Sequence, residues 1–301
     1  MPQPVALGIV GAGIMGERML GAVLDGAPGP VRIAGVWDPS PGAMDRIAAR
    51  FPAVERHLDA ASVIGSSECL YIASPPASHL GYARAALQAG KTAFVEKPLA
   101  VDLDEARAFV KAAGNQGTVN FPFASSLGVA SLRDWMAQGE VGRPLGVRIE
   151  VAFRAWPRPW QADAAGWLDG RAEGGFTREV VSHFLFLCRR LVGPLTGLKA
   201  RADFPEDGRS ERWIEATFSA GNIPVTLVGT VGQTTRDDHN SWTLEGEAGA
   251  VRLCDWAIAE RRLPGGEFQP APDAVSNEQA SPTIWRPCRR RSTSRRSSRP
   301  F

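Results

Sequence analysis

The pattern of hydrophobic and polar positions changes part-way along the chain. From Val5 to about Asn120, short apolar runs alternate with segments of helical period. Strands that are apolar throughout and alternate with helices are typical of a parallel sheet covered on both faces. The predicted strands are Val5–Val10, Val31–Trp37, Leu70–Ala73, Thr92–Val95 and Thr118–Phe121. The predicted helices between them are Ile14–Leu24, Gly42–Arg50, His79–Ala89 and Leu103–Ala113.

After about Pro144, apolar and polar residues alternate one by one, as they do in half-exposed antiparallel strands. One long helix, about Thr177–Leu191, interrupts this pattern. The segments that alternate are Val147–Phe153, Leu198–Phe204, Trp213–Phe218, Val225–Val231 and Trp242–Gly246. The pattern predicts a second, α+β domain with one open sheet face. We expect this face to join two or four copies as a homodimer or homotetramer, and a solvated face is the alternative.

Composition narrows the class of protein. The chain has 301 residues, of which 44% are apolar and 22% charged, which is typical of a globular protein. No run of 18 apolar residues occurs, so we expect no membrane span. The start of the chain lacks the basic region of a secretory leader, so we expect a cytoplasmic protein. The cysteines are far apart and form no CxxC pair, which argues for reduced thiols and against a metal site.

Basic residues are concentrated at the end of the chain. The formal net charge is +2, but seven arginines and no acidic residue lie in the last sixteen positions. Without these seven, 27 basic residues face 32 acidic ones, so the folded part offers no basic face for nucleic acid. We treat residues 281–301 as an atypical Arg/Ser-rich tail. It is an unstructured segment, an arm that binds a partner, or the out-of-frame end of a GC-rich gene.

A glycine motif follows the first predicted strand and opens the first helix. It consists of Gly11, Gly13 and Gly16 in the spacing GxGxxG. The first glycine permits a tight turn, the second lets a pyrophosphate approach the backbone, and the third lets helix and strand pack closely. The free N–H groups at the helix N-terminus favour the phosphates. The motif predicts a dinucleotide site.

An acidic residue completes this site. Asp38 ends the second predicted strand, 22 residues after Gly16, where a carboxylate binds the ribose hydroxyls of the adenosine. A carboxylate also repels a 2′-phosphate, so we expect NAD. NADP stays possible because Arg46 or Arg50 could pair with that phosphate.

Three further segments carry a family resemblance. They read LYIASPPASH over residues 70–79, AGKTAFVEKP over residues 89–98 and GGFTREVVSH over residues 174–183. Together with the glycine motif, they resemble the Gfo/Idh/MocA oxidoreductases, the family of glucose–fructose oxidoreductase and inositol dehydrogenase. The resemblance covers roughly residues 5–260. We therefore predict an α/β protein with a Rossmann doubly wound parallel sheet at residues 1–120 and an α+β domain with an open, mainly antiparallel sheet at residues 121–280.

The resemblance also implies which residues bind the cofactor and the substrate. The cofactor-binding residues would be Gly11, Gly13, Ile14, Met15, Gly16, Asp38, Ser74, Pro75, His79, Glu96 and Lys97. The substrate-binding residues would be Lys97, Asn120, Trp167, Arg178 and His183. Trp156 and Trp160 lie near Trp167 in the sequence and are as suited to a core as to stacking on a sugar.

Three side chains are candidates for catalysis. Lys97 follows a parallel strand at the carboxyl edge of the sheet, where a lysine can stabilise the alkoxide left as hydride departs. Glu179 and His183 are four residues apart on an otherwise apolar helix, and burying them without a function would be costly. His183 suits a general base, with Glu179 orienting the imidazole. A surface lysine and a core histidine bonded to a carbonyl are the alternatives.

The sequence departs from the family pattern at several positions. Glu179 replaces the usual aspartate, Val181 replaces a small residue, and the turn that begins at Asn120 lacks the usual arginine. We expect an NAD(P)-dependent oxidoreductase acting on a secondary alcohol of a sugar, polyol or related hydroxy compound. The alternatives are a hydrolase or lyase that oxidises its substrate transiently, and a catalytically weak nucleotide-binding sensor.

Overall fold

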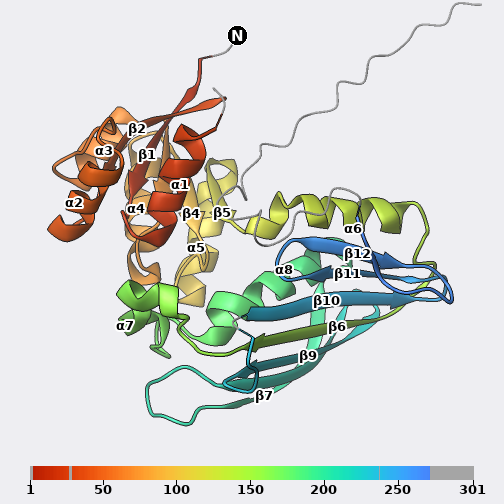
Figure 1. Cartoon of the computed structure of the whole chain (residues 1–301). Helices are drawn as coiled ribbons and strands as arrows, with labels where there is room; N and C mark the ends of the chain where they lie inside the picture. Colours follow the sequence, from red (N-terminus) through yellow and green to blue (C-terminus); the bar gives the residue numbers. More distant parts are fainter. Residues whose placement is uncertain (1–2, 27–28, 237, 272–301) are drawn as a thin grey trace, which may run out of the picture.

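Two β-sheets, one parallel and one mainly antiparallel, organise the computed structural model of the chain (Figure 1). The structure describes residues 3–26, 29–236 and 238–271. The Arg/Ser-rich tail at residues 281–301 therefore lies outside the described residues. Within them, no helix is both long and apolar enough to cross a membrane.

The N-terminal sheet has five parallel strands in the order β2-β1-β3-β4-β5. The strands are β1 (Val5–Val10), β2 (Val31–Trp37), β3 (Cys69–Ile72), β4 (Thr92–Glu96) and β5 (Gly117–Asn120). β1 and β3 are almost wholly buried, as apolar strands in a covered parallel sheet should be. The strand order reverses between β1 and β3, and ligands bind in such sheets at the carboxyl edge beside this reversal.

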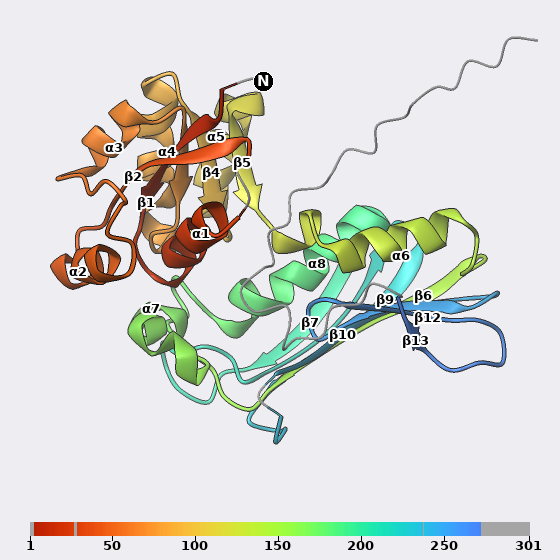
Figure 2. The ribbon, with the colours of Figure 1, turned by 45° about the horizontal axis from the view of Figure 1, so that its top comes forward.

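Helices cover both faces of this sheet. α1 packs on one face, and α3, α4 and α5 pack on the other (Figure 2). The helices are α1 (Ile14–Leu24), α2 (Pro41–Arg50), α3 (Ala60–Ser66), α4 (Pro76–Gln88) and α5 (Leu103–Ala113), with a 3₁₀ turn at Gly114–Gln116. The sequence did not predict α3, because its seven residues are too short to show a helical period. α4 begins three residues before the prediction, since Pro76 is well suited to the first turn of a helix.

The second sheet has eight strands in the order β13-β12-β11-β10-β6-β9-β8-β7. Its strands are β6 (Pro144–Phe153), β7 (Leu195–Asp203), β8 (Trp213–Ala220), β9 (Ile223–Val231), β10 (Asp238–Gly246), β11 (Ala250–Cys254), β12 (Ile258–Arg262) and β13 (Gln269–Pro270). β6 and β9 pair in parallel, and all the other neighbours are antiparallel. The predicted fold class, a parallel Rossmann sheet followed by a mainly antiparallel one, is confirmed.

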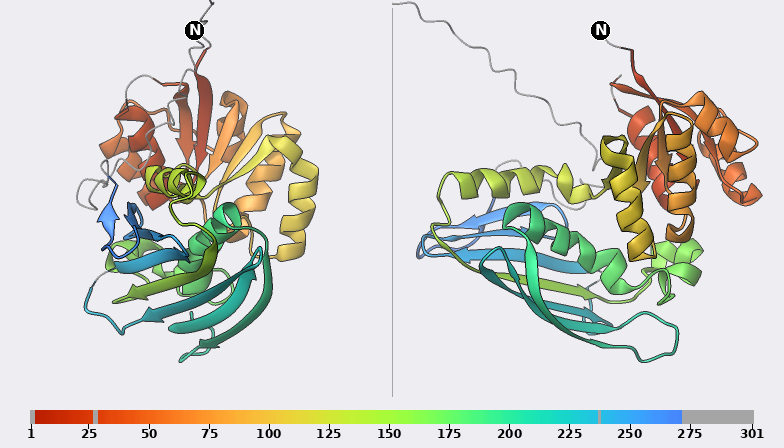
Figure 3. Two further views of the ribbon diagram at one scale, coloured as in Figure 1. Left: turned by 90° about the vertical axis from the view of Figure 1, so that its right-hand side faces the viewer. Right: turned by 180° about the vertical axis from the view of Figure 1, so that it is seen from behind.

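One face of the second sheet carries the core of this half. α6 (Leu127–Ala137) and α8 (Ser182–Leu191) lie on the same side of the sheet (Figure 3). Their apolar side chains meet the inward residues of the strands, with Trp242 and Phe153 fully buried. The opposite face is left uncovered by α6 and α8, and Val228 on β9 is exposed there. The shorter segments are 3₁₀ turns at Pro122–Ala124 and Pro159–Ala164, and α7 (Ala165–Leu168).

The long helix predicted over Thr177–Leu191 is interrupted. Thr177–Val181 (η4) is a π-helical turn, and α8 begins only at Ser182. The wider π turn is rare and occurs frequently at functional sites. It lies where the second half of the chain meets the end of β4.

Candidate active site

The glycine motif forms a cradle whose glycines have distinct roles. Gly11 has φ +100°, and a Cβ there would lie 2.5 Å from the backbone of Ser74. A Cβ on Gly16 would lie 1.9 Å from the carbonyl oxygen of Gly11. Beside Gly13, by contrast, a Cβ would meet nothing within 4 Å. Gly11 and Gly16 are therefore required by packing, whereas the backbone at Gly13 is open to a ligand.

The start of α1 is free to bind an anion. Its N-cap is Gly13, which offers no side-chain bond, and Ile14 and Met15 are its first residues. Their N–H groups have no acceptor within the helix. These residues fit a dinucleotide, whose pyrophosphate would accept from this helix N-terminus.

Asp38 is held facing the glycine loop. Its carboxylate accepts hydrogen bonds from the backbone N–H of Ala12, at 2.7 Å, and of Ser40, at 2.8 Å. Each oxygen keeps a lone pair for a ribose hydroxyl. The arginines considered for a 2′-phosphate are engaged elsewhere. The side chain of Glu17 accepts from Arg46 at 3.4 Å and from Arg50 at 2.8 Å. The site therefore fits NAD better than NADP.

His79 links the ends of two loops instead of facing the glycine cradle. Its Nε2 lies 2.7 Å from the carbonyl oxygen of Ser74, and its Nδ1 lies 2.9 Å from that of Pro98. Burial lowers the pKa of His79, while the two carbonyls act in the opposite direction. Both ring nitrogens of His79 therefore lie within hydrogen-bond distance of backbone carbonyls, and its predicted contact with the cofactor stays a prediction. Ser74 and Pro75 lie in the short loop between β3 and α4, and Pro75 is the N-cap of α4.

Glu96, the last residue of β4, belongs to a buried polar group. Its carboxylate accepts hydrogen bonds from the hydroxyl of Tyr71 and from the amide of Asn120, the latter at 2.6 Å. Burial raises the pKa of the Glu96 carboxyl, and these two bonds oppose the shift. The amide of Asn120, predicted to contact substrate, is thus bonded to Glu96.

Lys97 connects the two halves of the molecule. Its Nζ donates to the Glu179 carboxylate at 2.5 Å and to the Glu179 carbonyl oxygen at 3.0 Å. Both side chains are largely buried, with 14% of Lys97 and 5% of Glu179 exposed. The Lys97–Pro98 bond is cis. The other carboxylate oxygen of Glu179, Oε1, has no hydrogen-bond partner.

His183 lies among aromatic rings. The centroids of Phe121, Phe123 and Trp256 are 6.1, 5.8 and 5.6 Å from that of the imidazole. Burial lowers the pKa of His183 well below its ordinary value, and the positive charges of Lys97 and Arg158 act in the same direction. Its Nδ1 is buried without a hydrogen-bond partner, so the alternative of a core histidine bonded through Nδ1 to a carbonyl does not hold.

Glu179, expected to orient His183, makes no hydrogen bond to it in this structure, and the role stays a prediction. Residues four apart face the same way in a regular α-helix. The π turn over Thr177–Val181 changes that relation, and the carboxylate of Glu179 is bonded to Lys97. The imidazole is held by ring contacts instead.

The remaining predicted substrate residues lie nearby in the second half. Trp167 packs against the core, and the guanidinium of Arg178 donates to the carbonyl oxygen of Ala172 at 2.8 Å. Trp156 is a buried core residue. The ring of Trp160, in contrast, lies under two guanidinium groups, with Arg18 at 4.8 Å and Arg158 at 4.4 Å from its centroid.

Sequence reasoning missed Arg18, Arg158 and Trp256. Arg18 comes from α1, and the side chain of Arg158 is bonded to Asp238 at 3.0 Å. These residues lie far apart in the sequence, and none belongs to a motif. The one sequence feature that could have pointed to Arg158 is the segment from residue 156 to residue 160, in which two tryptophans flank this arginine.

Comparison with known families agrees with this geometry. Residues 5–122 match a family model described as an oxidoreductase family with an NAD-binding Rossmann fold. Residues 129–252 match a second model, described as the GFO/IDH/MocA C-terminal domain. The chain belongs to the GFO/IDH/MocA family. The resemblance identified from the glycine and Glu-Lys-Pro motifs is thereby confirmed.

Curated members of the GFO/IDH/MocA family match part of their length. Levoglucosan dehydrogenase of Pseudarthrobacter phenanthrenivorans is 27% identical over 215 residues, which cover 66% of this chain and 54% of that protein. Inositol 2-dehydrogenase of Acidothermus cellulolyticus is 31% identical over 152 residues, covering 48% of this chain and 43% of that protein. The chain thus spans about half the length of these relatives.

A solved structure shows the same fold over most of the chain. The WlbA dehydrogenase of Bordetella pertussis, in complex with NADH and UDP-GlcNAcA, aligns with a TM-score of 0.76 at 21% identity. The alignment covers 94% of this chain and 82% of that one. Both halves of the GFO/IDH/MocA fold are therefore present in their expected order.

Proposed function

We propose that the protein is an NAD-dependent oxidoreductase that transfers a hydride between the nicotinamide and a secondary alcohol or ketone of a sugar or polyol. The observation that carries this proposal is the junction at Lys97. An ammonium at the end of β4, its carboxylate partner Glu179 and the partnerless Nδ1 of His183 lie where two halves of an oxidoreductase fold meet. A bound nicotinamide supplies the hydride acceptor.

Lys97 acts on the substrate oxygen. Its ammonium donates a hydrogen bond to the reacting hydroxyl and stabilises the negative charge that develops as the hydride leaves. The ion pair with Glu179 fixes Nζ in position. Oε1 of Glu179 remains free to accept a hydrogen bond from a second hydroxyl of the substrate.

His183 takes the hydroxyl proton. Its depressed pKa keeps the imidazole neutral, and thus able to accept a proton, at neutral pH. Burial, together with the positive charges of Lys97 and Arg158, lowers this pKa and so disfavours the imidazolium. The protonated His183 therefore releases its proton readily. In the reverse direction, the imidazolium returns the proton to the alkoxide while the hydride is added to the carbonyl carbon.

Sugars and cyclic polyols suit the remaining surroundings. The levoglucosan and inositol dehydrogenases named above are enzymes of this substrate class. Aromatic side chains near His183 offer apolar faces to C–H groups. Arg178 precedes Glu179 in the chain, and Trp167 packs against the core of the second half. We assign these two residues to substrate contact.

The open face of the second sheet is the proposed contact between subunits. Its central strands present Val228 and Thr226 to solvent, and Leu198 lies on the edge strand β7. The outward positions of neighbouring strands are mainly polar, such as Arg148 and Thr217, so Val228 is an exposed apolar residue on an otherwise polar face that α6 and α8 leave uncovered. We assign this face to a second copy of the chain, giving a homodimer or a homotetramer.

Two measurements on the purified chain test the activity. Titration with NADH and NADPH, followed by quenching of tryptophan fluorescence, should show micromolar binding that favours NADH. Incubation with NAD and a panel of inositols, aldoses and anhydro sugars should then produce NADH continuously. Binding without turnover of any substrate would favour a nucleotide-binding sensor.

A matched variant separates binding from chemistry. Lys97→Met keeps a similar length but lacks the ammonium, so it should bind NADH and lose turnover by at least about a hundredfold. Equal turnover by Lys97→Met and the wild type would contradict the mechanism. Loss of NADH binding would place Lys97 in the cofactor site alone.

A further inference from the structure

The turn between β11 and β12 has an unusual backbone. Asp255 has φ 47° and Trp256 has φ 70°, and within the described residues these are the only non-glycine positions with positive φ. The N–H of Ala257 donates to the carbonyl oxygen of Cys254 at 3.3 Å and closes the turn. Glycine and asparagine normally occupy such positions, and a bulky aromatic residue there is strained. Such strain persists where the surroundings impose it, and it is concentrated at functional sites.

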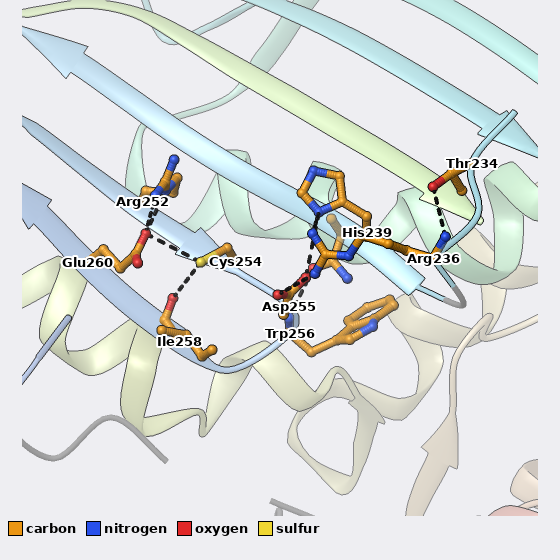
Figure 4. Close-up of polar contacts among 10 residues, drawn as sticks. Thr234, Arg236, His239, Arg252, Cys254, Asp255, Trp256, Ile258 and Glu260 are labelled. Atoms are coloured by element: carbon orange, nitrogen blue, oxygen red, sulfur yellow. Dashed lines mark hydrogen bonds and ion pairs between the residues drawn. The ribbon is translucent and has the colours of Figure 1, made fainter. Parts of the chain in front are cut away.

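A set of polar contacts imposes this conformation. The carbonyl oxygen of Asn240 accepts from the N–H of Asp255 at 3.0 Å, and its side-chain oxygen accepts from the N–H of Trp256 at 2.9 Å. Asn240 is completely buried. The carboxylate of Asp255 accepts from Arg236 at 3.1 Å and lies 3.7 Å from His239 (Figure 4). The fold thus holds Asp255 from two sides.

The strained turn determines where the indole of Trp256 lies. Figure 4 shows this side chain on the opposite side of Asp255 from the ring of His239. Its ring is perpendicular to the imidazole of His183, with an interplanar angle of 88° and centroids 5.6 Å apart. It also contacts the rings of Phe123, Phe153 and Phe184. Trp256 is only partly buried as a residue, and it packs at the edge of this aromatic cluster.

We propose that Trp256 is a positioning residue of the active site, which covers His183 and provides the wall for the C–H face of a ring-shaped substrate. This inference rests on the proposed function and narrows its substrate class to cyclic polyols and pyranoses. An indole offers a wide flat apolar surface, and the axial C–H groups of a six-membered ring form a matching patch. An open-chain polyol presents no such patch. The cost of the strained turn is thus explained by the place it gives the indole.

Steady-state kinetics test the proposal. Trp256→Ala should raise KM for a cyclic polyol about tenfold and leave KM for an open-chain polyol nearly unchanged. Trp256→Phe, which keeps a ring, should have an intermediate effect. NADH affinity should stay at its wild-type value in both variants. The matched control is Trp213→Phe on β8, a partly buried tryptophan with no ring contact to His183, which should change neither constant.

A pH profile separates positioning from packing. Without the indole, water reaches His183, so the acid limb of kcat/KM for Trp256→Ala should move to higher pH. The proposal would be overturned if Trp256→Ala only lowered Tm, with equal changes in KM for cyclic and open-chain polyols and an unchanged acid limb of kcat/KM. If Trp256→Ala fails to fold, Trp256→Phe carries the same two measurements. A wild type that neither binds NADH nor oxidises any polyol would overturn the proposed function itself, whereas an active wild type with unaffected Trp256 variants overturns only this inference.

Discussion

At the scale of single residues, Glu179 pairs with Lys97, whereas the sequence analysis expected it to orient His183. One of its oxygens binds Lys97 and the other is free, while His183 stands apart among aromatic rings. A glutamate carries one methylene more than the family's aspartate, and the π turn changes the direction from which it projects. We attribute the reach across the junction to these two features together.

The ion pair between Lys97 and Glu179 can be measured through stability. Breaking a buried pair by removing one partner leaves an uncompensated charge and costs about 3 kcal/mol or more. Glu179→Gln should therefore lower the free energy of unfolding by about 3 kcal/mol, as determined by denaturant titration. Turnover should fall as well, because Lys97 loses its anchor.

The double variant provides the control for this prediction. In Lys97→Met/Glu179→Gln no charge remains unpaired, so the loss should be smaller than the sum of the two single losses. Additive losses would show that the two side chains do not interact in solution.

The lowered pKa of His183 predicts weaker stability in acid. The folded state keeps the imidazole neutral, whereas the unfolded chain takes up a proton below about pH 6.5. Protonation therefore favours unfolding, and stability should fall as the pH drops from 7 towards 5. His183→Gln should lose about 1 kcal/mol less than the wild type over the first unit below pH 6.5. His79, whose pKa is also lowered, contributes equally in both proteins. Parallel curves of Tm against pH would contradict the assignment.

At the scale of elements, the sequence predicted what depends on local pattern. The parallel strands were visible because each is apolar throughout, and α1 because the glycine motif marks its start. β12 was not predicted, because its charged side chains obscure the alternation of apolar and polar residues. Glu260 on β12, for example, accepts a hydrogen bond from Arg252 on the neighbouring strand β11. The helical period of α6, with Val129, Leu132 and Trp135 buried, was present but was not recognised.

Contacts between elements were beyond a sequence pattern. Nothing in the order of residues indicates that Thr177–Val181 forms a π turn, or that Trp256 adopts a positive φ to reach His183. The motif residues Lys97, Glu179 and His183 were found because their chemistry is costly to bury without a function. Their partners depend on tertiary packing, so only the structure supplies them.

The glycine loop allows a prediction that separates folding from binding. Gly16→Ala should lower stability by about 1–3 kcal/mol, because its Cβ collides with the carbonyl of Gly11. Gly13→Ala meets no protein atom and should leave Tm almost unchanged. Its methyl group occupies the space of the pyrophosphate, so the Kd for NADH should rise at least about tenfold. Thermal melts and fluorescence titration of both variants check this. Unaltered NADH affinity in Gly13→Ala would place the cofactor elsewhere.

At the scale of the whole molecule, the uncovered sheet face sets the expected assembly. Val228 lies near its centre on β9 and is 39% exposed. Val228→Lys places a charge on this face and should convert the oligomer into monomers, as seen by light scattering after size-exclusion chromatography. NADH affinity should not change, because the face is remote from the glycine loop. A wild type that is already monomeric would contradict the proposed interface.

The chain passes between its two sheets once within the described residues, at the end of β5. Asn120, the last residue of β5, is bonded to Glu96 and so belongs to the first sheet, and the 3₁₀ turn at Pro122–Ala124 belongs to the second half. Because the chain passes from the first sheet to the second only once within the described residues, each half is encoded by one continuous stretch of the gene. A gene joined at this codon could combine the nucleotide half of one lineage with the substrate half of another. Compatibility would require matching the contacts between the halves, among them Lys97 with Glu179, the N–H of Ala77 with Glu173, and Arg18 with Trp160. Recombination at this one position would exchange the half that carries His183 and keep the glycine loop and Lys97 together.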